Sequence, residues 1–136
     1  RADLPVVTGL DVRALAADPA GQTARVAAGV RLVGLVAARA GLEVSELHLD
    51  PVRGYLLRAA WRPAAGGTRA PLTVVIGEEP FEPKLERLAR VLAYLAAAGA
   101  WPESVDLSAG RRAYVRLRAP AWGRDAGGPP VSTRSG

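Results

Sequence analysis

The side chains best placed for chemistry are one histidine and two acids on a predicted strand. His48, the single histidine of the chain, stands between Glu46 and Asp50 in the segment ELHLD. Because side chains alternate across a strand, all three project from one face. A metal centre usually takes more histidine or cysteine ligands than this segment supplies. We therefore interpret the trio as the solvated face of a strand, and we expect no metal and no cofactor.

Other catalytic patterns are weaker still. The pair Glu78-Glu79 could serve acid–base chemistry, but it precedes a predicted helix whose dipole favours acids at that end. Nucleophilic serine chemistry needs a base, and none stands beside the serines of the predicted strands, Ser45, Ser104 and Ser108. The glycine pairs lack the strand–loop–helix setting and the lysine of a phosphate-binding loop. The sequence therefore predicts a protein that is not an enzyme.

The strongest pattern is the segment Val105–Arg118, VDLSAGRRAYVRLR. Apolar and polar residues alternate in Val105–Ser108 and again in Ala113–Arg118, which predicts two strands that each bury one face. Ala109-Gly110 predicts a tight turn between them, with Gly110 available for a positive φ. Little chain follows that could add another strand. We therefore expect the second strand at a sheet edge, with backbone groups free to pair with another chain.

The basic residues of this segment allow more than one interpretation. The chain carries a net charge of +5, and arginines crowd the predicted hairpin at Arg111, Arg112, Arg116 and Arg118. With Tyr114 and Trp122 they could grip phosphates and stack a base, so a nucleic-acid-binding module is the alternative function. Arginines also protect an edge strand from aggregation, which would need no partner at all.

Composition bounds the organisation of the chain. Its 136 residues suit one domain, and a 49% hydrophobic content is enough for a core. There is no cysteine and no methionine, and neither a signal peptide nor an apolar run of membrane-spanning length is visible. We expect a piece of a longer protein, with a domain at residues 1–118 and a disordered tail at 119–136.

The remaining elements are predicted from the spacing of apolar residues and from residues that begin or end a helix or strand. Asp18-Pro19 is a helix start, and the helix expected at Gln22–Ala40 carries an apolar stripe of Val26, Val30, Val33 and Ala37. Strands are expected at Leu42–Leu49, with a bulge near Val44, at Tyr55–Arg62 and at Leu72–Ile76. A second helix follows Pro83. Leu4–Val7 is interpreted as an edge segment or packed lead-in, because Pro5 removes one ladder donor.

These elements predict an α+β domain. We expect a mainly antiparallel sheet of about five strands, with two helices packed on one face. The expected order is helix, three strands, helix, two strands.

The order of these motifs resembles the membrane-distal β domain of the bacterial cell-division family FtsQ/DivIB. The resemblance runs over roughly residues 4–118. The segments that carry it are Leu4–Gly9 (LPVVTG), Leu42–Asp50, Gly54–Leu57 (GYLL), Leu72–Gly77, Lys84–Leu88 (KLERL), Val105–Leu107 (VDL) and Ala113–Val115 (AYV). The chain departs from the family where Ser108 and Ala109 replace an arginine–tyrosine pair, and where Leu117 replaces an aromatic residue.

The resemblance implies a non-enzymatic divisome scaffold. In this family a membrane helix and a POTRA domain precede the β domain, which lies on the periplasmic face of the inner membrane at the division septum. The C-terminal sheet edge binds FtsB, in complex with FtsL, by strand addition, and no nucleic acid is expected. Transferred to this sequence, the partner-binding residues would be Arg112, Tyr114, Val115, Arg116, Leu117, Arg118 and Trp122. Of these, the arginines would meet acids, and Tyr114 and Trp122 would be apolar anchors.

Overall fold

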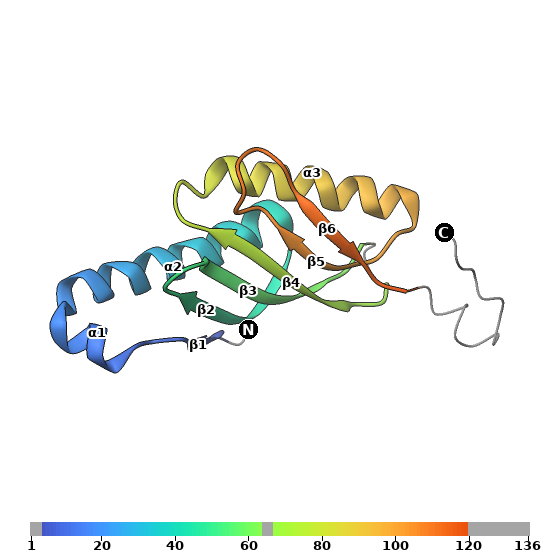
Figure 1. The fold of residues 1–136 in the computed structure, drawn as a ribbon. Coiled ribbons are helices and arrows are strands. Elements are labelled where there is room, and N and C mark those ends of the chain that lie inside the picture. The colour runs from blue at the N-terminus through green and yellow to red at the C-terminus, as the bar shows by residue number, and fades with distance from the viewer. Residues whose placement is uncertain (1–3, 64–66, 120–136) are drawn as a thin grey trace.

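The computed structural model describes residues 4–63 and 67–119. Its elements are, in chain order, β1 (Val6–Thr8), α1 (Val12–Ala17), α2 (Pro19–Ala40), β2 (Glu43–Asp50), β3 (Gly54–Trp61), β4 (Ala70–Gly77), α3 (Glu82–Ala98), β5 (Pro102–Asp106) and β6 (Tyr114–Leu117). The six strands form one sheet in the order of the sequence, from β1 at one edge to β6 at the other. Helices α2 and α3 lie side by side on one face of this sheet (Figure 1).

The α+β class is confirmed, but the predicted count and pairing of elements need correction. The sheet has six strands and not five, because Val6–Thr8, which overlaps the predicted edge segment Leu4–Val7, forms β1, and α1 adds a third helix. Pairs β1–β2 and β4–β5 are parallel, while the other three pairs are antiparallel. The parallel pairs arise where helices connect consecutive strands, since a parallel neighbour requires a long crossover.

Helix α2 shows where the helix prediction was right and where it was not. The side chain of Asp18 accepts from the Gly21 N–H at 3.1 Å and caps the helix, which begins at Pro19, so the predicted start signal is confirmed. The predicted apolar stripe is right in part: Val26 and Val33 pack against the core, whereas Val30 is 59% exposed and Ala37 is also exposed. The buried positions are Gly29, Leu32 and Val36. A Cβ on Gly29 would lie 2.7 Å from Leu47 Cδ2, so the missing side chain lets α2 approach the sheet.

The core lies between the helices and the sheet. Helix α3 buries Leu85, Leu88, Leu92 and Leu95, as its apolar spacing predicts. The ring of Tyr55 meets Phe81 edge to face, with centroids 5.4 Å apart, and its hydroxyl donates to the Arg25 carbonyl at 2.7 Å. Burial raises the pKa of this phenol. The predicted bulge is confirmed, because the β2–β3 register shifts between Val44 and Glu46.

None of the described helices is both long and apolar enough to cross a membrane.

Candidate partner-binding edge

Strand β6 lies at the sheet edge, as predicted from its position in the chain. It pairs with β5 in antiparallel register, Ser104 opposite Arg116 and Asp106 opposite Tyr114, and no other described strand borders it. Strand β6 is shorter than the predicted Ala113–Arg118, and β5 lies at Pro102–Asp106 in place of Val105–Ser108, so the two strands are further apart than the sequence predicted. In place of a tight turn at Ala109-Gly110, a connection of seven residues separates β5 from β6.

The physical reason for this correction lies at the end of β5. The carboxylate of Asp106 accepts from the backbone N–H of Ser108 at 2.9 Å and from its hydroxyl at 2.6 Å. Such an Asx-type turn takes the chain out of the strand directly. Gly110 then adopts φ 65°, the positive value expected of it. The connection carries the exposed Arg111 and Arg112.

The direction of the backbone groups of β6 follows from two hydrogen bonds. Arg118 donates its N–H to the Trp101 carbonyl at 2.7 Å, toward the chain of β5, whereas Leu107 donates to Val75 in β4. Because the direction of the backbone N–H and C=O groups alternates along a strand, those of Tyr114 and Arg116 also point at β5. Val115 and Leu117 therefore turn their N–H and C=O groups outward, away from the sheet.

Side chains on β6 divide between two faces. Val115 packs partly against the core on the side of the helices, and Leu117 shares that direction but remains 55% exposed. Leu117 therefore does not join the buried face that its alternation predicted, because it lies beyond the core at the strand's end. Tyr114, also 55% exposed, and Arg116 project from the opposite face.

Arg118 is held inside the domain. Its guanidinium Nη2 donates to the Pro71 carbonyl at the start of β4, at 2.6 Å. The side chain is only partly exposed, and its Nε is buried. The structure thus brings Arg116 and Tyr114 together on one face, places Arg112 in the connection and uses Arg118 within the fold. Trp122 and the expected tail beyond residue 119 lie outside the described residues.

Sequence reasoning missed the flank of α3 beside this edge. By the 3.6-residue period, Lys84, Arg87, Val91 and Tyr94 share one flank. Tyr94 is 73% exposed. Sequence could have found it, because a lone tyrosine opposite a leucine stripe stands on the exposed side of a helix.

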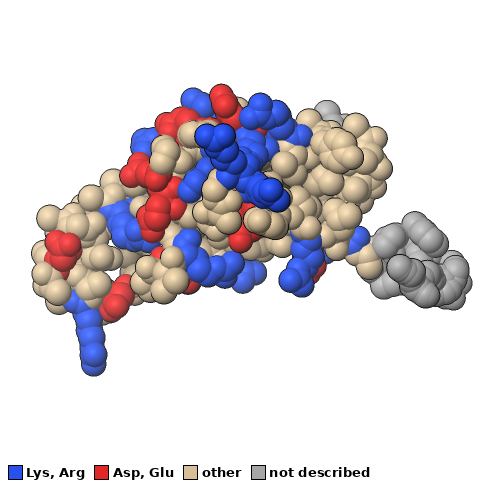
Figure 2. Space-filling view, turned by 45° about the horizontal axis from the view of Figure 1, so that its top comes forward, with Lys and Arg blue, Asp and Glu red and all other residues tan. Residues whose placement is uncertain are grey.

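Two contacts show which way this flank faces. A Cβ on Gly77 would lie 3.2 Å from Lys84 Nζ and 2.9 Å from Ser108 Cβ, so the lysine lies against the connection before β6. The Lys84 ammonium donates to the Glu78 carbonyl at 2.6 Å, and burial, then the nearby Arg87, lowers the pKa of Lys84. Figure 2 shows basic side chains gathered on this side of the molecule, with acidic side chains next to them.

The histidine trio is placed on the sheet face opposite the helices. The Thr8 hydroxyl of β1 donates to Glu46 Oε2 at 2.6 Å and contacts His48 Nδ1 at 2.8 Å, while His48 Nε2 lies 3.9 Å from Asp50 Oδ2. Among the described residues, no group of three or more histidine, cysteine or acidic side chains is arranged to hold a metal ion. Thr8 is the member of this cluster that the sequence did not indicate.

These observations define a class: a small α+β domain whose mixed sheet is covered by helices on one face and ends in an edge strand with outward backbone groups. No protein-family model matches the chain. Its sequence is 32% identical over 117 residues to a protein named Cell division protein FtsQ from Geotalea daltonii. The match covers 84% of this chain and 40% of the relative, so the chain spans about two fifths of the relative's length. Over these residues the similarity supports the FtsQ/DivIB family, which the motifs of the chain predicted.

Proposed function

We propose that this domain is a non-enzymatic cell-division scaffold that binds an extended segment of a partner by strand addition to β6. The observation that carries the proposal is the outward direction of the backbone groups of Val115 and Leu117 at an edge that no described strand occupies. The relative's name supports the cell-division role. The partner we propose is of the FtsB type, in complex with an FtsL-type protein.

Backbone pairing alone is too weak to hold such a complex. Two outward residues offer up to four hydrogen bonds, each contributing about 0.5–1.5 kcal/mol net. Association costs at least about 4 kcal/mol in lost freedom. Side-chain contacts must therefore supply most of the affinity, and the two faces of β6 are suited to partner side chains of different kinds.

The faces of β6 define the partner's pattern. A residue paired opposite Arg116 would lie on the uncovered face, where a carboxylate complements the guanidinium. Residues opposite Val115 and Leu117 would lie on the side of the helices, where Leu117 presents exposed apolar surface. The partner segment should therefore alternate acidic and apolar residues. Arg112 is placed to meet a further acid beside the strand.

The location follows from the family. We propose that the domain acts at the division septum, on the periplasmic face of the inner membrane, with its membrane anchor in sequence outside this chain.

The test removes outward donors one at a time. Val115→Pro and Leu117→Pro each delete an outward N–H and should abolish binding of the co-purified FtsB/FtsL-type complex, measured by titration calorimetry. Val115→Thr and Leu117→Thr keep the donor and the strand preference, and should retain most of the affinity. Proline variants that stay folded by circular dichroism and bind like the unaltered domain would exclude strand addition at β6.

The same preparation tests the nucleic-acid alternative. A labelled single-stranded oligonucleotide should show no retention by the domain at 50 mM salt. This low salt concentration gives the most sensitive test, because contacts with phosphates weaken as the salt concentration rises. Retention that disappears in an Arg111→Ala, Arg112→Ala double variant would favour nucleic acid over a protein strand.

A further inference from the structure

The segment Leu4–Ala17, which we name the strap, is attached to the rest of the domain with little buried surface. It comprises β1, α1 and the turn between them, and none of its residues is buried. Its large apolar side chains are 42–91% exposed, at Leu4, Val6, Leu10, Val12 and Leu15. Because the cost of local opening follows the apolar area buried, the strap should open more readily than the core strands.

A short ladder and one side-chain cluster hold the strap in place. Strand β1 pairs with β2 over three residues, Val6 to Glu46 through Thr8 to His48. The hydroxyl of Thr8 has a single proton, which it donates to the Glu46 carboxylate at 2.6 Å. The 2.8 Å contact with His48 Nδ1 therefore requires an N–H on that nitrogen, donating to the Thr8 oxygen. We name Thr8, Glu46 and His48 the clamp.

The clamp is itself braced by β2 and β3. Arg58 Nε lies 3.2 Å from Glu46 Oε1, which fixes the carboxylate from the side away from β1. The side-chain hydrogen bonds between strap and sheet therefore all lie on one residue of the strap, Thr8, whereas the brace from Arg58 lies within the sheet. Val7 adds a partly buried contact with the core.

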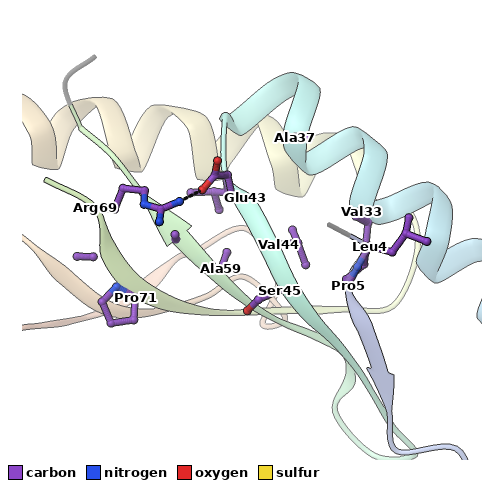
Figure 3. Close-up of a pocket in the computed structure, with 13 residues that line it drawn as sticks. Leu4, Pro5, Val33, Ala37, Glu43, Val44, Ser45, Ala59, Arg69 and Pro71 are labelled. Atoms are coloured by element: carbon purple, nitrogen blue, oxygen red, sulfur yellow. Dashed lines mark hydrogen bonds and ion pairs between the residues drawn. The ribbon is translucent and has the colours of Figure 1, made fainter. Parts of the chain in front are cut away.

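The strap borders a surface that its departure would enlarge. Strand β2 has eight residues, and β1 covers the outer side of three of them. Next to the uncovered part, a groove of about 970 Å³ is lined by Leu4 and Pro5 of the strap, by Val33 and Ala37 of α2 and by Val44 of β2. Figure 3 shows Leu4 and Pro5 at one end of this groove and the Glu43–Arg69 ion pair at the other.

We propose that the strap detaches and recloses while the rest of the domain stays folded, and that the Thr8 clamp sets how often it does so. Every buried residue of the described chain lies between Gly29 and Leu107, outside the strap, so the domain can retain its core without it. Opening exposes the outer edge of β2 and widens the groove. This opening is local, because it breaks only the β1–β2 pairing over three residues and the hydrogen bonds of the clamp.

Native-state hydrogen exchange tests the proposal. In the unaltered domain, the ladder amides of β1 should be at least about 100-fold less protected than those of β3 and β4. Thr8→Val removes both clamp hydrogen bonds and keeps the shape, so it should lower the protection of β1 by a further factor of about 3–10 and leave β3 and β4 unchanged. Thr73→Val, the same change on the same sheet face in β4, should not alter exchange of β1.

Two outcomes would overturn the proposal. One is protection of β1 equal to that of β3 and β4 in the unaltered domain, which would mean that the strap leaves only on global unfolding. The other is an equal loss of protection in all strands of Thr8→Val, which would mean that the clamp stabilises the whole fold. The first comparison needs no variant, so it holds even if Thr8→Val does not fold.

Discussion

The two edges of the sheet solve the same problem in opposite ways. An edge strand presents unpaired backbone groups that invite indiscriminate pairing. At the β1 edge, the strand is three residues long and follows Pro5, so it offers little ladder to a neighbour. At the β6 edge, Val115 and Leu117 present their groups on a regular strand, and protection is left to the charge of Arg116. A charged edge excludes most chains and admits one with complementary charge, so β6 is the edge suited to a chosen partner.

The edges also differ in how the chain reaches them. At the β1 edge, Gly9 adopts φ 83° with its Cβ position 2.1 Å from the Leu49 carbonyl oxygen, so the backbone passes tightly over the end of β2. At the β6 edge, Gly110 adopts φ 65° with nothing within 4 Å of its Cβ position. One glycine is required by space and conformation, the other by conformation alone.

The largest expected effect comes from this pair of glycines. Gly9→Ala should cost about 2–4 kcal/mol of unfolding free energy, from a left-handed conformation and a backbone clash together. Gly110→Ala should cost about 1 kcal/mol, because it meets only the conformational term. Urea denaturation followed by fluorescence measures both. If the strap detaches, part of the Gly9→Ala cost should appear as faster exchange of β1. Equal losses of unfolding free energy for the two variants would show that the close approach of Gly9 to the Leu49 carbonyl adds no cost.

A smaller effect separates two arginines of the β6 edge. Arg118→Met removes the hydrogen bond to the Pro71 carbonyl and should cost about 1–2 kcal/mol of stability. Arg116→Met should change stability by less than about 0.5 kcal/mol, because Arg116 forms no ion pair with another described residue. Partner affinity should respond in the reverse order, with the larger loss for Arg116→Met. Thermal unfolding and calorimetric titration of both variants provide the comparison, and a loss of affinity confined to Arg118→Met would reverse these roles.

The sequence predicted much of the β6 edge, and the reasons are local. Alternation in Ala113–Arg118 predicts the strand, and its place after all the other predicted strands predicts the edge position. Alternation does not determine whether Val115 or Arg116 turns its N–H outward, because that depends on the hydrogen bonds to β5. The hydrogen bond of Arg118 to the Pro71 carbonyl could not be predicted, because Pro71 lies 47 residues away and the two residues meet only in the folded domain. The Asx turn at Asp106 lengthened the connection, although Ala109-Gly110 has turn composition.

The β1 edge was the harder region. Three residues beside a proline carry too little periodicity to predict a strand, and the parallel pairing depends on a crossover through α1 and α2. Thr8 could not be assigned to the His48 cluster from sequence, since 40 residues separate them. In α2, small residues are spread around the helix, so the core-facing side was decided by Gly29 approaching Leu47 and Tyr55.

The smallest effect concerns acid stability next to the β1 edge. The Asp50 carboxylate accepts from the backbone N–H groups of Val52 and Arg53 at 2.8 and 2.7 Å, and these bonds, from Arg53 first, lower its pKa below 3.8. The folded state therefore binds a proton at Asp50 less readily than the unfolded state. The resulting stability is complete above the unfolded pKa and is lost as pH falls through the lower folded value.

Asp50→Asn should accordingly flatten the acid limb of the stability curve, as pH falls through and below the ordinary aspartate pKa, with little change in its slope at neutral pH. The amide oxygen can keep the turn, so the fold should persist. Urea denaturation at stepped pH measures the effect, and Asp106→Asn, in the corresponding turn at the β6 edge, is the matched comparison. An acid limb unchanged by Asp50→Asn would show that the bonds to Val52 and Arg53 do not favour the ionised carboxylate, and the β2–β3 turn would then contribute nothing to the acid sensitivity of this edge.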